Sequence, residues 1–348
     1  MSNLTRRQFL RRLVAAGLGT LAGSWLLSGC GKQETPTPRQ PLAPTRTPVP
    51  PTAITGATQA PTAVVEATSV PTTAPSIEYP HLAVARGGEP AQLVRSALAA
   101  LGGMERFVRS GDDVIVKPNI CVGYHTYEYA VTTNPWVVAE LVRLCLEAGA
   151  RRVRVMDSPF GSGPEEAYAR SGIQEQVLAA GGQMEIMARF KFVPTEIPEG
   201  LDLRQKEIYD DVLKADVVIN VPIAKHHNLA RLTLGMKNLM GVITNRPEMH
   251  ANLGQRLADL TSRVRPQLTV VDAVRILKAH GPTGGNLGDV QKADTLIASP
   301  DIVAADSYAA TLFGLRPEDL AYVRAGAAMG LGRGDLGDLK IEEIAVGT

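Results

Sequence analysis

The chain has 348 residues and a nearly even balance of charge, with 36 Lys and Arg, 35 Asp and Glu, and a formal net charge of +1. This balance excludes the basic excess that a nucleic-acid-binding protein uses to contact phosphates. The 45% hydrophobic residues can form a substantial core. The three cysteines form no C-x-x-C cluster, so neither an intrinsic iron–sulfur cluster nor a structural zinc site is expected.

Residues 1–29 predict a signal peptide for export through the twin-arginine route. The segment TRRQFLR at residues 5–11 matches that signal, and an apolar region follows it at residues 13–27. This region is too short for a comfortable bilayer span, so we expect cleavage, with an uncleaved membrane anchor as the alternative. Residues 27–30, LSGC, resemble a bacterial lipoprotein box, which makes Cys30 the expected site of lipidation. Acyl chains on Cys30 would hold the protein at a membrane, outside the cytoplasm.

Residues 30–78 predict the lipidated cysteine followed by a disordered linker. Between residues 34 and 76, proline, threonine and alanine dominate and charges are few. Such a composition cannot bury a core and favours extended polyproline-like conformations, so we expect a tether. A docking site for a proline-recognising partner is the alternative. The remaining residues, 79–348, are long enough for one large domain.

Strand and helix patterns alternate along residues 79–348, as is typical of a Rossmann-like α/β fold. A helix predicted from Asn134-Pro135 to Gly149 separates the first two strands. Strands are predicted at residues 113–117, 153–156, 217–220, 268–271 and 295–298, and a further helix at residues 302–313. We therefore predict a largely parallel sheet flanked by helices.

Polar residues follow four of these predicted strands. They are Lys117 with Asn119, Asp157, Lys225 with His226, and Asp272. In open parallel sheets, ligands bind beyond the carboxyl ends of the strands, so we expect these side chains to converge on one crevice. The lysines are suited to a carboxylate or a phosphate, and the two aspartates to a divalent cation or a proton. Each aspartate taken singly is also typical of a helix cap or a turn.

Two adjacent histidines follow the third of these strands, and adjacent side chains of an extended segment point to opposite sides. We expect His226 to face the site, as an acid–base group or a metal ligand, and His227 to be structural. Helical spacing at residues 233–240 could turn Lys237 and Asn238 back toward the same crevice. A surface lysine on an amphipathic helix is the alternative for Lys237.

Two glycine-rich loops and two cysteines complete the candidate residues. The loop GSGP at residues 161–164 lacks the full dinucleotide fingerprint and is more typical of a plain turn. The loop GPTGG at residues 281–285 could cradle an anion on its backbone, with Gly284 as a contact, or form a tight reversal. Cys145 falls on the apolar side of its helix, whereas Cys121 could act as a nucleophile or a soft metal ligand.

The order of several motifs resembles domain of unknown function family 362. The matching segments are VIVKPN (114–119), TNP (133–135), EAGA (147–150), INVPIAKH (219–226), MKNLMG (236–241) and ASPDIVAAD (298–306). The resemblance implies functional roles for the polar motif positions Lys117, Asn119, Asp157, Lys225, His226, Lys237, Asn238, His250, Asp272 and Asp306. Some members of that family carry an added ferredoxin-like cysteine cluster, which this chain lacks. The threonine that usually separates the lysine and the histidine is also absent, because His226 follows Lys225 directly.

The leading hypothesis is a membrane-anchored enzyme that acts on a small anionic substrate, with metal-dependent or redox chemistry as the candidate activities. Its assigned residues are His226, His250, Asp272 and Lys225 for catalysis, Lys117, Asn119, Lys237, Asn238 and Gly284 for substrate binding, and Asp157 with Asp272 for a divalent metal. The alternative is a ligand-binding lipoprotein that serves a transporter or a redox partner. A structural envelope protein with a degenerate site is the third hypothesis. The sequence specifies neither the reaction nor a cofactor.

Overall fold

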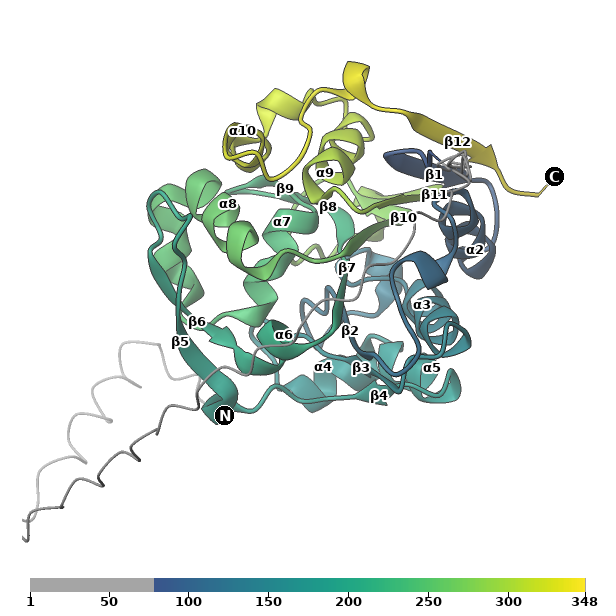
Figure 1. Cartoon of the computed structure of the whole chain (residues 1–348), viewed down its shortest axis with the longest axis horizontal. Coiled ribbons are helices and arrows are strands. Elements are labelled where there is room, and N and C mark those ends of the chain that lie inside the picture. Colours follow the sequence, from purple (N-terminus) through teal and green to yellow (C-terminus); the bar gives the residue numbers. More distant parts are fainter. Residues whose placement is uncertain (1–77, 348) are drawn as a thin grey trace, which may run out of the picture. The chain divides into compact units, whose positions relative to one another are not determined.

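A ten-stranded, mostly parallel sheet forms the centre of the folded unit, which the computed structural model describes from residue 78 to residue 347 (Figure 1). Its main path has the strand order β12-β1-β11-β10-β7-β2-β3-β4, and β8 and β9 are attached beside β10. The strands are β1 (Leu82–Arg86), β2 (Asp113–Pro118), β3 (Arg152–Val155), β4 (Gln183–Met184), β7 (Val217–Val221), β8 (Ile223–His227), β9 (Arg231–Thr233), β10 (Leu268–Leu277), β11 (Val290–Ser299) and β12 (Ile341–Ala345). A separate hairpin consists of β5 (Phe192–Glu196) and β6 (Gln205–Tyr209). The predicted α/β class is confirmed, whereas the predicted signal peptide, the linker and Cys30 lie outside the described residues.

Helices cover both faces of this sheet (Figure 1). The first face carries α2 (Pro90–Ala100), α3 (Pro135–Glu147), α4 (Pro164–Arg170) and α5 (Ile173–Ala179). The second face carries α6 (Asp210–Lys214), α7 (Gly235–Asn238), α8 (Leu253–Val264), α9 (Ile302–Thr311) and α10 (Ala321–Ala328). Short 3-10 helices are η1 (Met104–Arg106), η2 (Tyr127–Tyr129), η3 (Arg189–Lys191), η4 (Leu239–Val242), η5 (Arg246–Asn252), η6 (Leu287–Asp289), η7 (Pro317–Asp319) and η8 (Leu336–Asp338). Among residues 78–347, no helix is long and apolar enough to cross a membrane.

Strand β2 shows how the sequence places the sheet between two apolar layers. All six residues of its DVIVKP segment are buried, as is typical of a parallel strand covered on both faces. Val114 and Val116 belong to the core on the side of α2 and α3, whereas Ile115 belongs to the core on the opposite side. Because side chains alternate along a strand, Lys117 follows Ile115 onto the face of α7 and α8.

A proline divides the apolar run around residues 217–227 into two strands. Strand β7 ends just before Pro222, and β8 begins just after it. β7 pairs with β2 and β10 in parallel, whereas β8 continues along β10 and forms an antiparallel pair with β9. The sequence patterns predicted the first of these strands. The second one is the element that presents Lys225 to the site described below.

Candidate active site

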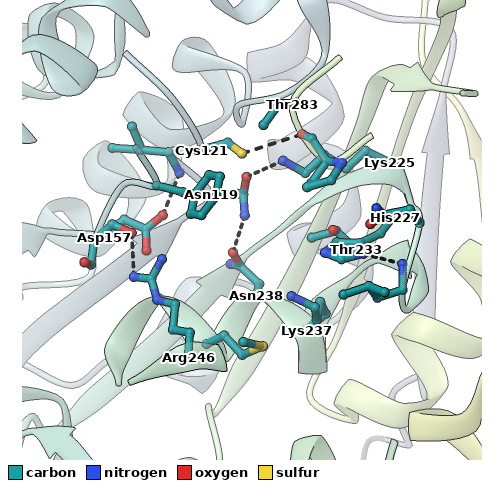
Figure 2. A pocket seen from close by; sticks show the side chains of 18 of the residues that line it. Asn119, Cys121, Asp157, Lys225, His227, Thr233, Lys237, Asn238, Arg246 and Thr283 are labelled. Carbon is teal, nitrogen blue, oxygen red and sulfur yellow. Dashed lines mark hydrogen bonds between the residues drawn. The ribbon is translucent and has the colours of Figure 1, made fainter. Parts of the chain in front are cut away.

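A pocket of about 400 Å³ opens where β2, β3 and β8 end and where α7 and η5 face them (Figure 2). Its polar lining is Lys117, Asn119, Cys121, Asp157, Ser158, Lys225, His227, Asn228, Thr233, Lys237, Asn238, Arg246, His250 and Thr283. Its apolar lining includes Ile120, Phe160, Leu229 and Met240. The structure therefore brings together seven of the ten residues that the sequence assigned to catalysis, substrate binding or a metal, together with Cys121: the seven are Lys117, Asn119, Asp157, Lys225, Lys237, Asn238 and His250.

Lys117 and Asp157 form a buried ion pair at this pocket. Lys117 is 1% exposed, and its Nζ lies 2.8 Å from Asp157 Oδ1. The same ammonium group donates hydrogen bonds to Pro118 O at 2.9 Å and to Asn238 Oδ1 at 2.8 Å. Asp157 Oδ2 accepts a hydrogen bond from Ile120 N at 2.7 Å. Burial lowers the pKa of Lys117 to about 8, and the neighbouring Asp157 opposes that change. Two hydrogen bonds and the ion pair therefore hold the Lys117 ammonium group in place.

A network of amides fixes the other buried lysine. Lys225 is 1% exposed, and its Nζ donates to Asn119 Oδ1 at 3.0 Å and to Val131 O at 2.7 Å. Asn119 Nδ2 in turn donates to Asn238 Oδ1 at 2.9 Å, and Asn238 Nδ2 donates to Asn220 Oδ1 at 2.9 Å. These bonds set which end of each amide is the acceptor. They leave one proton of the Lys225 ammonium group without a protein acceptor among residues 78–347.

Lys237 and Arg246 carry charge that the described residues leave uncompensated. Lys237 is half-buried, and among residues 78–347 no hydrogen-bond acceptor or carboxylate pairs with its Nζ. Burial lowers the pKa of Lys237 to about 8, and the positive charges of Lys225 and Arg246 add to this effect. Arg246 Nη2 donates to Ser158 O at 2.6 Å, which neutralises none of its charge. The pocket therefore has an excess of positive charge, concentrated where β8, α7 and η5 meet.

His227, and not His226, lines the pocket. Lys225 and His227 are two residues apart in β8 and share one face of the strand, so His226 points to the other face. His226 Nδ1 accepts a hydrogen bond from Gly281 N at 3.1 Å, which ties β8 to the following loop. We expected His226 to face the site and His227 to be structural, whereas the structure places His227 in the pocket lining and His226 outside it. Its error was to pair the site lysine with the adjacent residue instead of with the alternate one.

The His227 ring is held in one neutral form by its surroundings. Its Nδ1 accepts hydrogen bonds from Leu229 N at 3.1 Å and Ala230 N at 3.3 Å. Burial, and then the charges of Lys237 and Lys225, lower the pKa of His227 to about 3. With Nδ1 as the acceptor, the single ring proton resides on Nε2. His250 also lines the pocket but is exposed on η5, and its pKa is lowered by partial burial and by Lys237.

Asp272 and Gly284 lie outside the pocket lining. The Asp272 carboxylate is fully buried, and it accepts hydrogen bonds from Asn134 N at 2.7 Å and from Val274 N at 3.0 Å. It thereby joins β10 to the start of α3, and burial raises its pKa to about 6. Gly284 has a φ of +58°, and a Cβ there would lie 2.9 Å from Val131 Cγ1. Gly284 is therefore required by the turn and its packing, and it makes no contact with the pocket.

The predicted metal site at Asp157 and Asp272 is not assembled. Asp157 lines the pocket and is paired with Lys117, whereas Asp272 binds two backbone N–H groups elsewhere. Within residues 78–347, no group of three His, Cys, Asp or Glu side chains is placed to hold a metal ion. A divalent cation would also meet the surplus of lysine and arginine charge. The donor set of this pocket therefore does not fit a divalent metal.

Sequence reasoning missed Arg246 and left two further residues unresolved. Arg246 has no strand before it, and its only signal was its place shortly after the MKNLMG segment. Asp306, on α9, accepts hydrogen bonds from Gly235 N at 2.6 Å and Met236 N at 2.9 Å, and so holds the first turn of α7. Asp306 thus positions the helix that carries Lys237 without lining the pocket itself. Cys121 does line the pocket, and its Sγ lies 3.6 Å from Pro282 O.

Known proteins similar to this chain include one relative and two solved structures. A thylakoid-associated protein of Synechocystis sp. is 29% identical over 254 residues, which cover 68% of this chain and 74% of that protein. The lactate racemase apoprotein of Thermoanaerobacterium thermosaccharolyticum has a TM-score of 0.40 at 11% identity, covering 61% of this chain and 53% of that chain. A protein from Thermotoga maritima has a TM-score of 0.41 at 11% identity, covering 65% of this chain and 60% of that chain. The chain thus spans less than two thirds of either solved structure.

A family model also matches residues 114–311, which include β2, β3, β8, α7 and the pocket residues they carry. The match covers more than half of the chain. The chain therefore belongs to the family described as Domain of unknown function (DUF362).

Proposed function

We propose that the folded unit is an enzyme that binds a small organic anion in this pocket. The observation that carries the proposal is the charge of the lining: Lys117, Lys225, Lys237 and Arg246 face one carboxylate, Asp157. That carboxylate is already paired with Lys117. Uncompensated charge in a partly buried site is costly, and a bound anion would compensate it.

The size and the mixed lining of the pocket favour an organic anion over a simple inorganic one. Its volume of about 400 Å³ falls in the range of small-molecule sites. Phe160, Leu229 and Met240 provide apolar surface beside the cations. A ligand with one carboxylate or phosphate and a short apolar body would use both parts of this lining.

Two groups in the pocket, Lys237 and His250, are suited to proton transfer, and His227 is suited to donating a hydrogen bond. Lys237, whose pKa is lowered to about 8, can exchange a proton near neutral pH. His227 offers an Nε2–H donor, and the exposed His250 can shuttle a proton to solvent. Lys225 and Arg246 then bind the anion, while His226 and Asp272 position the strands. This assignment replaces His226 and Asp272 as acid–base groups.

Isothermal titration calorimetry with acetate, lactate, pyruvate, phosphate and sulfate tests the binding. Lys237→Met and Arg246→Met should each weaken binding of the preferred anion by about tenfold, which corresponds to the loss of one close charge. Lys214→Met is the matched control, because the Lys214 side chain is 71% exposed and, within residues 78–347, forms an ion pair only with Asp210. Absence of binding by every anion would refute the proposal.

Turnover separates an enzyme from a ligand-binding protein with the same pocket. Incubation of the preferred anion in D₂O, followed by NMR, would reveal deuterium entering the ligand or a new product. Saturable binding with neither outcome would favour the ligand-binding lipoprotein that serves a transporter or a redox partner. Loss of the reaction in Lys237→Met with binding partly retained would support proton transfer by this residue.

We also propose that the protein is exported through the twin-arginine route and anchored to a membrane through Cys30. The support comes from residues 5–11 and 27–30 of the sequence. The similar protein of Synechocystis sp. is named as thylakoid-associated, which supports an association of this chain with a membrane. Cys30→Ser should move the protein from the membrane fraction to the soluble fraction of its host, and a joint Arg6→Lys and Arg7→Lys change should retain the precursor inside. Unchanged fractionation of both variants would refute the anchor.

A further inference from the structure

We propose that Lys237 condenses with a carbonyl group of the bound anion, so that the ligand is an oxo acid or an anionic aldehyde. The inference rests on the proposed function and narrows its substrate class. It makes Lys237 a nucleophile and assigns the binding of the anionic group to Lys225 and Arg246.

The hydrogen bonds of the three lysines distinguish Lys237 from the other two. Lys117 Nζ forms the ion pair with Asp157 and donates hydrogen bonds to Pro118 O and Asn238 Oδ1. Lys225 Nζ donates to Asn119 and Val131 O. A Schiff-base nitrogen keeps at most one N–H, so condensation at Lys117 or Lys225 would deprive at least one buried acceptor of its donor, at a cost of about 1–3 kcal/mol for each bond. Among residues 78–347, the Lys237 amine has no acceptor to lose.

The charges around Lys237 also favour its neutral, nucleophilic form. Lys225, Arg246 and Lys117 lie close enough to disfavour a further positive charge, and the one carboxylate of the pocket lining, Asp157, is paired with Lys117. The resulting pKa of about 8 leaves a substantial neutral fraction just above neutral pH. Lys117 has a similarly lowered pKa, but its Nζ is engaged by Asp157, Pro118 O and Asn238 Oδ1. Geometry, and not pKa alone, therefore selects Lys237.

The condensation needs no oxidant, reductant or metal. The lone pair of Lys237 Nζ attacks the carbonyl carbon, and the carbonyl oxygen takes a proton to give a carbinolamine. Loss of one amine proton and departure of that oxygen as water then form the C=N bond. His250 lines the same pocket and can pass a proton from solvent to the departing oxygen, while His227 Nε2–H can donate a hydrogen bond to that oxygen. The anionic group keeps its pairing with Lys225 and Arg246 throughout.

Reductive trapping of the full chain tests this step. The protein is incubated with pyruvate or glyoxylate and sodium cyanoborohydride, which delivers hydride to the C=N bond and fixes the ligand as a secondary amine. Intact mass and peptide mapping then locate the adduct. We expect one adduct per chain at Lys237, formed about tenfold or more faster than any adduct at exposed Lys214. Acetone, which is neutral, and lactate, which has no ketone or aldehyde group, should give no selective adduct.

Variants and a binding measurement separate the possible outcomes. Lys237→Arg should abolish the adduct while keeping the charge, and Lys214→Arg should leave labelling unchanged. Circular dichroism and calorimetry with lactate show whether Lys237→Arg is folded and still binds an anion. Anion binding without an adduct, or with adducts spread over surface lysines, would overturn this inference and leave the proposed function standing. Absence of both binding and adduct would overturn the two together.

Discussion

Gly241 occupies a position where the buried ion pair leaves no room for a side chain. A Cβ atom there would overlap Asp157 Oδ1 and Lys117 Nζ, and it would lie 2.6 Å from Lys117 Cε. Gly241→Ala should therefore push the two charges apart in a site where neither can reach water. Because a separated buried pair is strongly destabilising, we expect the free energy of unfolding to fall by about 3 kcal/mol. Urea unfolding of the purified protein measures this change.

Gly163→Ala is the matched control for that substitution. Gly163 precedes α4 with a φ of −62°, and the nearest atom to its added Cβ would be Glu165 Oε2 at 3.8 Å. This methyl group meets only ordinary van der Waals contact, so the stability should change by less than about 0.5 kcal/mol. Equal stabilities of the two alanine variants would contradict the argument from the Lys117–Asp157 pair.

His227 should make the fold sensitive to acid. Its folded pKa of about 3 lies below the ordinary 6.5, so the unfolded chain binds a proton first as the pH falls. Its contribution to stability is therefore present above pH 6.5 and is lost progressively toward pH 3. His227→Asn does not titrate in this range, and its side-chain oxygen can accept from the same two backbone N–H groups. Between pH 7 and pH 4.5, we expect the free energy of unfolding to fall by up to about 2 kcal/mol less in the variant than in the original protein.

Denaturant unfolding at both pH values measures that difference. The comparison is made between two pH values within each protein, so any constant cost of the substitution cancels. Identical acid sensitivity of the His227 variant and the original protein would show that the ring does not titrate as described.

Individual residues of the site were only partly predictable from the sequence. Lys117 and Asp157 follow apolar strands directly, so the rule of carboxyl strand ends was enough to select them. The choice between His226 and His227 depends on whether the segment after Pro222 is itself a strand. Asp272 also follows the predicted part of a strand, but β10 continues through it, and its carboxylate bonds to backbone instead of a ligand. The sequence does not show which strands continue beyond their apolar run, because this depends on tertiary contacts.

At the scale of elements, the short helix α7 depends on a carboxylate from another helix. Its four residues are too few for a stable helix alone, and Asp306 on α9 accepts the first two N–H groups, from Gly235 and Met236. Asp306→Ala should free these groups, reduce stability by about 2 kcal/mol and weaken anion binding by about tenfold, since α7 carries Lys237. Hydrogen exchange at Gly235 and Met236 should accelerate more than exchange in α8.

The control for Asp306 lies on the same helix. Asp301 caps α9 itself by accepting from Ala304 N at 2.9 Å, and it has no hydrogen bond to α7. Asp301→Ala should lower stability without selectively accelerating exchange in α7 or weakening anion binding. Equal losses of binding in both variants would indicate a general loosening of the fold and would contradict a positioning role for Asp306.

The elements themselves were predicted best where the pattern is local. The strands β2, β3 and β7 and the helix α3 appear within a few residues of their predicted bounds, because continuous apolar runs and the Asn134-Pro135 cap are local signals. The direction of β11 was not predictable, since antiparallel pairing with β10 and β1 depends on chain connection and not on local pattern. The short strand β9 and the exposed strand β12 have no continuous apolar run, and neither was predicted.

At the scale of the whole molecule, the topology brings positively charged side chains together in one pocket, although the chain as a whole is almost neutral. The formal charge of the sequence is +1, yet parallel β2, β3 and β8 bring Lys117 and Lys225 to one edge, and α7 and η5 add Lys237 and Arg246. Other charges pair among themselves away from the pocket, as Arg154 does with Asp113, Glu185 and Asp211. The net charge of the chain therefore does not indicate that the pocket is suited to an anion, whereas the lysines at the strand ends do.

This concentration of lysine charge makes anion binding depend on pH. The pKa values of Lys237 and Lys117 are lowered to about 8, and an anion favours the protonated form. Affinity should therefore be highest below pH 8 and decline as pH rises through that value, by about tenfold between pH 7 and pH 9.5. Calorimetry with sulfate, which does not titrate in this range, measures the decline. In Lys237→Arg the guanidinium stays charged, so most of the decline should disappear and only the part due to Lys117 should remain. An unchanged decline in that variant would assign the effect to Lys117, and a flat profile in the original protein would mean that neither lysine senses the anion.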